Sequence, residues 1–490
     1  MTEADPKSSA AAPAAGAPRP AYDITGLKAR LAGIKTEDNP ALVKQKSRDF
    51  YWYSPTLKRQ LDHVVGDIIV SPSSEQEVIE TLGAAFELGI PVTPRGTGTG
   101  NYGQAMPLSG GIVLDLSGMN RVKAVQPGRF VAEAGTVIAE IDKVARPQNQ
   151  EIRMHPSTYA TASVGGFIAG GSGGIGSITW GGLRDAGNVI RLKVVTMEES
   201  PRVLELTGDD LAKVAHAYGT NGIITEVEMP LGPAYPWTDL FLGFDTFERA
   251  AAFANELGEQ DGIAKKNIAV VAAPAPQTYF LRHQDYMAAG QHVVIAIVAE
   301  FAVDAALNLA RKAGAELLLR SDKVPEEERR KLPPGFELTW NHTTLRALRV
   351  DPAITYLQVL YPFPDQVKLA NALHERFGEE VIGHLEFVRF DGKVTCFGLP
   401  MVRFTTEERL EEIMRIHEEM GAPIFNPHRY TLEEGGMKQT DEVQLAFKRE
   451  ADPKGLLNPG KMIAWEDPDY DYRSGKTFLF RSLAAAGVSP

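Results

Sequence analysis

Two glycine-rich segments between Pro94 and Gly182 constrain this chain more than any other feature. The first reads Pro-Arg-Gly-Thr-Gly-Thr-Gly-Asn over residues 94–101, and the second, from Val164 to Gly182, contains nine glycines. Glycine tolerates positive φ and close backbone approach, so consecutive N–H groups can converge on an anion. Two such segments between predicted strands indicate a long diphosphate ligand held between two pieces of backbone.

Both segments match the Gly-x-Gly-x-x-Gly pattern of dinucleotide-binding βαβ units, at residues 98–103 and 171–176. That pattern places a pyrophosphate only where a helix begins in it. Pro107 and two glycines follow the first match, and Ser-Ile-Thr-Trp-Gly-Gly follows the second, so neither continuation favours a helix. We therefore interpret both matches as false and expect loops to hold the phosphates.

Composition restricts the class of protein. The chain has 490 residues, of which 43% are hydrophobic and 23% charged, as is typical of a soluble globular protein with more than one core. The net charge of −12 argues against a nucleic-acid partner, and no apolar run approaches the roughly 20 residues that cross a bilayer. The single cysteine, Cys396, excludes an internal disulfide. We expect a cytoplasmic protein without a transmembrane segment.

Hydrophobic periodicity predicts alternating strands and helices rather than a repeat array. A capping box at Ser74 and Glu77 predicts the start of one helix. Alternating or apolar runs predict strands at 67–71, 90–93, 111–116, 130–134, 190–194 and 224–229, the last ended by Pro230. Helices are expected after Ser74, from Thr136 and over 209–218.

The segment Gly-Pro-Ala-Tyr-Pro-Trp, which begins at residue 232, is rich in residues that interrupt helices and strands and indicates a domain boundary. Beyond it, helices are predicted at 246–257, 304–313, 365–377 and 405–420, with strands at 293–300, 355–360 and 381–390. Asp391-Gly392 predicts a hairpin, and the charged stretch 323–331 predicts a solvated loop or helix face. This pattern indicates an antiparallel sheet with helices on one side.

Four motifs in order resemble the vanillyl-alcohol-oxidase and p-cresol-methylhydroxylase superfamily. They are Pro91–Gly100 of the sequence, the segment from His155 through the second glycine cluster, Tyr218-Gly-Thr-Asn-Gly-Ile-Ile-Thr225, and Asp452-Pro-Lys-Gly-Leu-Leu-Asn-Pro-Gly-Lys461. The last is similar to the closing motif of the branch that contains the glycolate oxidase D-subunit and D-lactate dehydrogenase. The resemblance covers residues 55–463.

The resemblance implies an α+β fold. It comprises a two-subdomain FAD-binding domain of the PCMH type (41–235), an α+β cap with an antiparallel sheet (236–425, here the cap region), and a C-terminal return to the FAD domain (426–465). The ends, 1–40 and 466–490, are expected to be tails.

The implied cofactor is FAD, and the motifs carry over its binding positions residue by residue. These are Pro94, Arg95, Gly96, Thr97, Gly98, Thr99, Gly100, Asn101, Ser157, Ser163, Gly165, Gly166, Gly173, Gly174, Ile224 and Asn458.

The chain also departs from the family's patterns. Covalent members often carry a histidine in the first loop, where this sequence has Gly98-Thr-Gly-Asn, so we expect dissociable FAD. The hydroxy-acid branch commonly has Gly-His-x-Gly-Asp-Gly-Asn-x-His and Glu-His-Gly segments. This chain keeps Gly383-His384 but reads Glu433-Glu-Gly-Gly at the second position, which disfavours a divalent metal and weakens a hydroxy-acid assignment.

Oxidation of an alcohol requires a base for the hydroxyl proton, a role suited to histidine. His428, in Phe-Asn-Pro-His-Arg-Tyr, lies just before the chain returns to the flavin domain and is our leading candidate, against the alternative of a packing histidine. His384 is more simply a strand residue, and His342 is a third candidate.

An anionic substrate would need a cation with planar donors. Arg389 and Arg403 occupy similar strand contexts, although both could face solvent. Lys438 lies where phenol-oxidising relatives carry an anion-binding residue. Glu434, with Glu433, could act as a base or support one, or could be a solvated pair.

The leading hypothesis is an FAD-dependent dehydrogenase or oxidase that transfers a hydride from a small alcohol or 2-hydroxy acid. Two alternatives remain: oxidation of a phenolic or aromatic alcohol, and a flavin subunit that only relays electrons. The expected partners are a small-molecule substrate and an electron acceptor, which could be oxygen, a quinone or a redox protein. A homodimer is left open.

Overall fold

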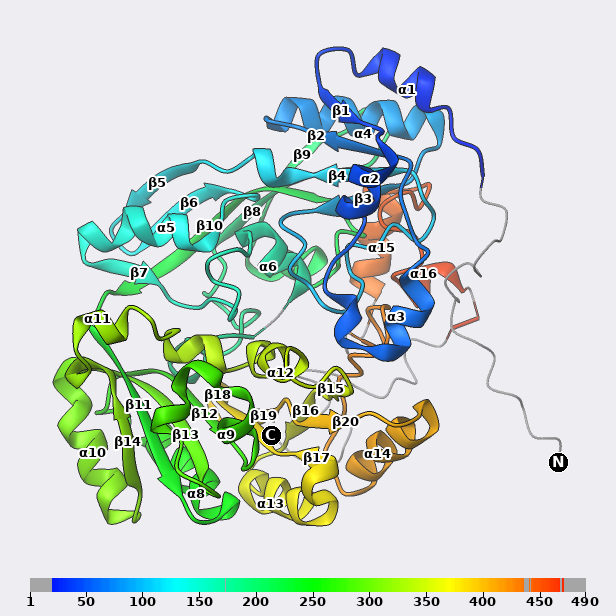
Figure 1. Ribbon diagram of the computed structural model, residues 1–490. Helices are drawn as coiled ribbons and strands as arrows, with labels where there is room; N and C mark the ends of the chain where they lie inside the picture. The colour runs from blue at the N-terminus through cyan, green and yellow to red at the C-terminus, as the bar shows by residue number, and fades with distance from the viewer. Residues whose placement is uncertain (1–19, 172, 436–439, 441, 468, 471–490) are drawn as a thin grey trace.

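The computed structural model describes residues 20–171, 173–435, 440, 442–467 and 469–470, and its fold is α+β (Figure 1). The blue-to-green part of the ribbon, shown at the top, carries both glycine segments, and the green-to-yellow part below carries most of the cap region. No helix in the described ranges is long and apolar enough to cross a membrane.

The first sheet delivers the first glycine segment. Its strand order is β1-β2-β4-β3, in which β4 pairs in parallel with β2 and β3. The strands are β1 (Lys35–Glu37), β2 (Ile68–Ser71), β3 (Val92–Arg95) and β4 (Ile112–Asp115). The predicted capping box is confirmed, because the Ser74 hydroxyl accepts the Glu77 N–H at 3.2 Å and starts helix α4 (Glu75–Leu88). The helices that precede it are α1 (Ile24–Arg30), α2 (Pro40–Lys46) and α3 (Pro55–Leu61).

The second sheet carries the second glycine segment. Its order is β5-β6-β10-β8-β9, and β7 also pairs with β10. The strands are β5 (Val122–Gln126), β6 (Arg129–Glu133), β7 (Gln150–Ile152), β8 (Arg191–Val195), β9 (Val203–Thr207) and β10 (Ile223–Pro233). Three helices lie between them in sequence: α5 (Ile138–Ala145), α6 (Val164–Gly170) and α7 (Ser177–Trp180).

Three sequence-based expectations for this part are wrong. Strand β10 does not end at Pro230, because this proline lies where pairing passes from β6 to β7 and no ladder N–H is required of it. Residues 209–218 form a 3₁₀ helix only over Gly208–Lys213 and then turns. The second glycine segment is not all loop, since α6 lies within it and the four-residue α7 begins directly after Gly176.

The cap region contains a seven-stranded sheet of order β14-β11-β13-β12-β18-β19-β16, antiparallel throughout. Its strands are β11 (Trp237–Phe244), β12 (Lys265–Val271), β13 (His292–Ala299), β14 (Glu316–Arg320), β16 (Val359–Tyr361), β18 (His384–Phe390) and β19 (Lys393–Gly398). The predicted Asp391-Gly392 hairpin is confirmed by the pairing of Phe390 with Lys393. A smaller sheet comprises β15 (Ile354–Tyr356), β17 (Val381–Ile382) and β20 (Met401–Arg403).

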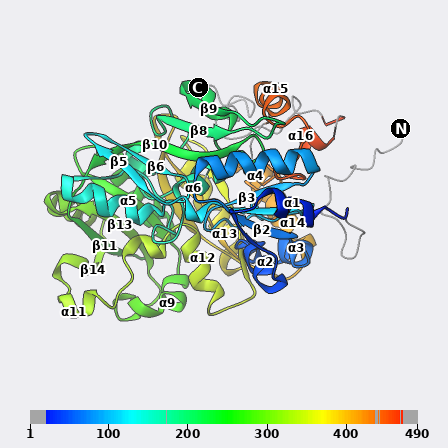
Figure 2. The ribbon, with the colours of Figure 1, turned by 90° about the horizontal axis from the view of Figure 1, so that it is seen from above.

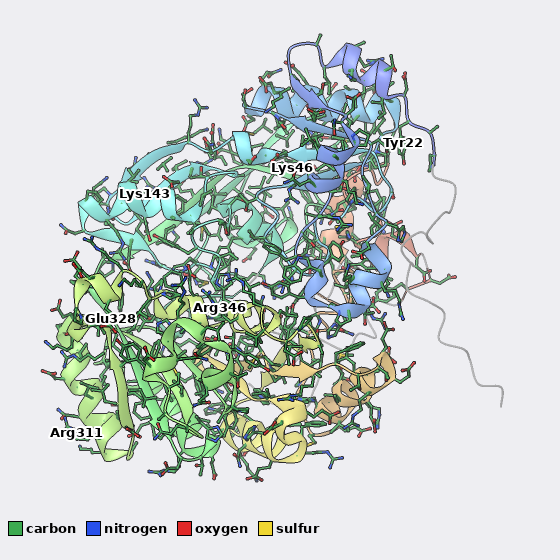
Figure 3. All side chains as sticks on the ribbon, in the orientation of Figure 1. Tyr22, Lys46, Lys143, Arg311, Glu328 and Arg346 are labelled. Carbon is green, nitrogen blue, oxygen red and sulfur yellow. The ribbon has the colours of Figure 1, made fainter. Side chains whose placement is uncertain are left out.

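The four helices predicted for the cap region are confirmed as α8 (Phe247–Glu259), α10 (Val303–Lys312), α13 (Gln366–Phe377) and α14 (Glu407–Glu419). The additional helices are α9 (Ala275–Tyr279), α11 (Glu326–Arg329) and α12 (Asn341–Leu348). Helix α11 lies in the charged stretch and buries no residue. Helix α12 lies between the upper and lower parts of the ribbon, as the position of Arg346 in Figure 3 also shows.

Near its C-terminus, the chain returns to the first sheet through residues 456–458. The N–H of Val92 donates to the Leu456 carbonyl, and the N–H of Asn458 donates to the Val92 carbonyl, both at 2.8 Å. Helices α15 (Glu442–Ala451) and α16 (Ile463–Glu466) flank this contact, and both views place them beside the N-terminal sheets (Figures 1 and 2). Residues 456–458 thereby support strand β3, which leads into the first glycine segment.

Candidate functional site

A large cavity lies where the two glycine segments face helix α12 and the end of β19. Every residue from Pro94 to Asn101 lines it, together with Ser157, Ser163, Gly165, Gly166, Gly173 and Ile224. We call this cavity the central cleft. Most of the residues predicted to bind the diphosphate ligand are thus brought to one place, although they come from two sheets.

The two glycine segments contact each other directly. The backbone N–H of Ser163 donates to the Thr97 hydroxyl at 3.2 Å. A Cβ built on Gly96 would clash with the Ser163 side chain. Only glycine at position 96 therefore allows this approach.

The first loop also depends on Gly98 and Arg95. Gly98 has φ +71°, and a Cβ there would clash with the Arg95 guanidinium. That guanidinium donates to the Arg48 carbonyl and, at 3.2 Å, to the Thr97 carbonyl. Arg95 is mostly buried, and its charge is used to hold the loop backbone in place.

Two predicted cofactor residues lie outside the cleft lining. Gly174 packs against the His155 backbone, and its N–H donates to the Ser177 hydroxyl at 3.2 Å. The Asn458 amide donates to the Gln104 carbonyl at 2.8 Å and to the Tyr218 carbonyl at 2.7 Å. Both residues are therefore placed to support the cleft from behind.

The cleft offers hydrogen-bonding groups that the protein itself does not use. The buried Ser163 hydroxyl and the Tyr218 hydroxyl have no hydrogen-bond partner in the described residues, and both residues line the cleft. A buried polar group without a partner costs free energy unless a ligand or water satisfies it. These groups, with the exposed backbone of residues 96–101, fit a ligand that carries phosphate and hydroxyl groups.

The cap region supplies the opposite wall. It contributes Trp340, Asn341 and His342 at the start of α12, with Gln358, Phe397, Leu399 and Phe425. His342 has a buried Nδ1 with no hydrogen-bond partner among the described residues. Burial, with the positive charges of Arg346 and Arg349, lowers the pKa of His342 to about 4. Its imidazole is therefore neutral near pH 7 and can accept a proton.

Trp340 is held in an unusual backbone conformation, with φ +53°. Its N–H donates to the Glu386 carboxylate at 2.5 Å, and its indole N–H donates to the Asn267 side chain at 3.2 Å. Glu386 in turn contacts His384, Nε2 to Oε1, at 2.8 Å, and both side chains are fully buried. The His384–Glu386 pair therefore positions the cleft wall, a role that sequence spacing did not indicate.

The leading histidine candidate is engaged elsewhere. His428 is buried outside the cleft lining, with Nδ1 2.7 Å from the Ser54 hydroxyl and Nε2 3.0 Å from the Tyr356 carbonyl. A neutral imidazole satisfies both contacts by accepting at Nδ1 and donating from Nε2. Burial lowers its pKa to about 3. Both ring nitrogens are used, so the described geometry supports a positioning role.

The two candidate anion-binding arginines are also placed away from the cleft. Arg403, exposed at the end of β20, pairs with Glu379 at 3.3 Å, and Arg389 pairs with Asp261. Neither arginine lines the central cleft. Glu434 accepts the Thr431 hydroxyl at 2.9 Å and is half-buried. Lys438 lies outside the described residues.

The neighbouring Glu433 is buried and has a structural function. Its carboxylate accepts the N–H groups of Ile463 at 2.9 Å and Ala464 at 3.1 Å, at the start of α16. Among the described residues, no group of three or more His, Cys, Asp or Glu side chains could hold a metal ion.

Comparisons with known proteins agree with this geometry. A family model described as "FAD binding domain" matches residues 66–204. The chain is 25% identical over 428 residues to the glycolate oxidase subunit GlcD of Bacillus subtilis, covering 81% of this chain and 89% of the relative. It is also 25% identical over 431 residues to the D-lactate dehydrogenase of Archaeoglobus fulgidus, covering 81% and 91%.

Solved structures share the fold. An alkyldihydroxyacetonephosphate synthase aligns with TM-score 0.69 at 16% identity, covering 90% of this chain and 85% of that one. The 4-ethylphenol oxidase of Gulosibacter chungangensis aligns with TM-score 0.63 at 17% identity, covering 89% and 95%. The predicted FAD-binding fold is confirmed.

Replacement of Gly98 tests the first loop. We expect Gly98→Val to weaken FAD binding about ten-fold or more, because a branched side chain opposes positive φ and fills the space beside Arg95. The measurement is FAD content and affinity of the purified variant. Gly128→Val is the matched control, since Gly128 has φ +79° but no atom near its Cβ. Equal FAD affinity in both folded variants would contradict the assignment.

Replacement of His428 tests its positioning role. We expect His428→Ala to lower the free energy of unfolding by about 1–3 kcal/mol, because partners of two buried hydrogen bonds are lost. The pKa of His428 is lower in the folded state, so the unfolded state gains a proton first as the pH falls below about 6.5. The parent's advantage over the variant should therefore be largest above that pH and shrink as the solution is acidified.

Urea denaturation at several pH values measures both effects. An unchanged unfolding midpoint combined with much slower flavin reduction would instead restore His428 as a reacting group.

Proposed function

We propose that this chain, an FAD-linked oxidoreductase of the vanillyl-alcohol-oxidase and p-cresol-methylhydroxylase type, oxidises the CH–OH group of a small alcohol or 2-hydroxy acid. The observation that carries the proposal is the position of His342. This residue lines the same cleft as the two glycine segments, and its buried Nδ1 has no hydrogen-bond partner among the described residues. The full-length similarity to GlcD and D-lactate dehydrogenase supports the reaction class.

FAD, when bound, supplies the acceptor for the hydride that leaves the substrate carbon. The backbone of residues 96–101 and the hydroxyl of Ser163 would hold its diphosphate. Tyr218 and Ile224 would contact the flavin end, because they line the cleft beside β10. These assignments would give hydrogen-bond partners to the Ser163 and Tyr218 hydroxyl groups, which have none among the described residues.

His342 would accept the hydroxyl proton at Nδ1. A base with a pKa of about 4 is weak, but it suffices where proton and hydride leave together. The substrate oxygen becomes a carbonyl oxygen in that step and loses its affinity for the proton. Burial keeps the imidazole unprotonated beforehand, and the charges of Arg346 and Arg349 add to this effect because they oppose a further positive charge.

A phenolic or other aromatic alcohol is a second candidate, and the composition of the wall favours it. Trp340, Phe397 and Phe425 line the cleft, whereas Arg95 is the one Lys or Arg among the described lining residues and is committed to the first loop. A neutral aromatic substrate needs no cation. An anionic substrate would need one from outside this set.

A substrate panel tests the proposed function and separates the candidates. Purified protein is mixed without oxygen with 2-hydroxy acids, aliphatic alcohols and para-substituted benzyl alcohols, and flavin absorbance is followed. Bleaching by hydroxy acids or aliphatic alcohols supports the first candidate, and bleaching only by aromatic alcohols supports the second. A flavin that dithionite reduces and no panel member reduces would favour electron relay. Repetition in air separates an oxidase from a dehydrogenase.

Replacement of His342 tests the proposed base. We expect His342→Gln to slow flavin reduction by about a hundred-fold or more while FAD stays bound. His292→Gln is the matched control, because burial also lowers the pKa of His292 to about 4 but this residue does not line the cleft. Rapid mixing with a substrate identified by the panel measures both variants. Equal rates in the two variants would remove His342 from the reaction.

The pH dependence gives a second readout for the same residue. The neutral base is lost only as the pH falls through about 4, so the parent reduction rate should be flat between pH 6 and 8. An acid limb centred near the ordinary histidine pKa of about 6.5 would contradict the assignment.

FAD attachment is expected to be non-covalent. The first loop offers only Gly98, Thr99, Gly100 and Asn101 at the positions where covalent relatives carry histidine. Acid or heat precipitation should therefore release intact yellow FAD into the supernatant. Flavin that remains with the precipitated protein would show a covalent bond to another residue.

A further inference from the structure

A second cavity, of about 250 Å³, lies between the second sheet and the cap region. Its lining comes from the end of β7 and β10, from α7, and from strands β11, β12 and β18. It shares no lining residue with the central cleft. We call it the Trp180–Trp237 cavity, after two of its aromatic side chains.

Two cations of this cavity have no carboxylate partner among the described residues. Within the described part of the chain, the Arg153 guanidinium donates one hydrogen bond, from Nε to the Leu231 carbonyl at 3.3 Å. The Lys265 ammonium donates only to the carbonyls of Gln260 at 2.7 Å and Ile263 at 3.3 Å. Lys265 is 5% exposed, and burial lowers the pKa of its ammonium to about 8, so most of it is still protonated near pH 7. Several N–H donors of the two side chains remain available to an anion.

The other charged groups of the cavity compensate one another. Lys266 pairs with Glu151 at 2.8 Å, and Glu151 also accepts the Trp237 indole N–H at 3.0 Å. Arg146 contacts the same carboxylate. Arg389 pairs with Asp261 at the exposed side. The lining thus holds four cations against two carboxylates, and the surplus lies on Arg153 and Lys265.

Aromatic rings form the remaining walls. The Arg153 guanidinium lies 4.3 Å from the ring centre of Trp180. Tyr235 and Trp237 form an edge-on pair with centroids 5.6 Å apart. Indole rings beside cations that form no ion pair with a carboxylate favour a ligand that joins a flat apolar body to a negative charge.

We propose that the Trp180–Trp237 cavity binds a planar aromatic carboxylate at a site separate from the central cleft. The carboxylate pairs with Arg153 and Lys265, and the ring packs against Trp180 and Trp237. Glu151 does not repel the ligand strongly, because Lys266 and Arg146 already neutralise it. Arg389, expected from sequence to bind an anionic substrate, lies at this second cavity instead.

The site also contacts the second glycine segment. The Gly176 N–H donates to the Lys266 carbonyl at 2.7 Å, and the Thr179 hydroxyl donates to the Lys265 carbonyl at 2.5 Å. A ligand here therefore touches both α7 and the cap strand β12, without touching the loop that lines the central cleft.

The test uses holoprotein and three probes: benzoate, its neutral isostere benzamide, and inorganic phosphate. Ligand-observed NMR titration gives the dissociation constants. We expect saturable benzoate binding, with benzamide and phosphate each at least about ten-fold weaker. Lys265→Met and Arg153→Gln should each weaken benzoate binding about ten- to a hundred-fold.

Two controls locate the bound probe. Arg403→Gln removes an exposed, paired cation outside both cavities, and His342→Gln alters the central cleft. Both should leave benzoate affinity unchanged. Variants that fold normally are identified by an unchanged FAD content and an unchanged thermal unfolding midpoint. If Lys265→Met does not fold, Lys265→Arg takes its place, and this variant should keep most of the benzoate affinity.

Several results would overturn the proposal. They are the absence of saturable benzoate binding, equal affinity for benzamide, phosphate binding as tight as that of benzoate, and unchanged benzoate affinity in both cation variants. Loss of benzoate binding in His342→Gln alone would place the probe in the central cleft. None of these outcomes bears on flavin reduction, so this site and the proposed function fail independently.

Discussion

The contact between Thr97 and Ser163 joins the two glycine segments that line the central cleft. One hydrogen bond of 3.2 Å joins a loop that follows β3 of the mixed first sheet to the start of α6, which packs against the antiparallel second sheet. Gly96 permits this approach, because any side chain there would occupy the position of the Ser163 hydroxyl. The central cleft exists because two separately folded sheets present bare backbone to the same space.

The C-terminal segment holds this arrangement from behind. Asn458 bridges the carbonyls of Gln104 and Tyr218, one from each side of the cleft. The fully buried Lys461 donates to the Gly103 carbonyl at 2.6 Å, near the equally buried Asp49. The burial of both groups raises the pKa of Asp49 and lowers that of Lys461. The backbone beside the cleft is thus held by C-terminal residues that lie 240, 354 and 358 positions away in sequence.

Much of this architecture follows from local sequence. Capping and alternation predict α4, β8 and the β18–β19 hairpin because these features depend on neighbouring residues. The glycine loops are recognisable because their function lies in the backbone, which glycine exposes wherever the loop is placed. The resemblance motifs predict the diphosphate-binding residues for the same reason.

The substrate side of the cleft is less predictable, because it depends on tertiary contacts. Trp340 owes its conformation to Glu386, and nothing within its own segment indicates that partner. His428 lies just before the C-terminal segment that returns to the FAD-binding domain. Its two ring nitrogens nevertheless contact Ser54 and Tyr356, and the sequence around His428 does not indicate these partners. The residues next to His342 in sequence do not indicate where it lies. The fold places it in the lining of the central cleft, together with the glycine segments. The predicted strand that contains Arg389 likewise did not indicate which of the two cavities this residue lines.

We propose that both glycine segments and α12 enclose one flavin. Hydrogen–deuterium exchange of the apoprotein with and without saturating FAD measures this enclosure. We expect the amides of residues 96–101, 163–171 and 340–342 to become protected together, with little change around Arg153 and Lys265. Protection of one glycine loop alone, or protection centred on the Trp180–Trp237 cavity, would contradict it.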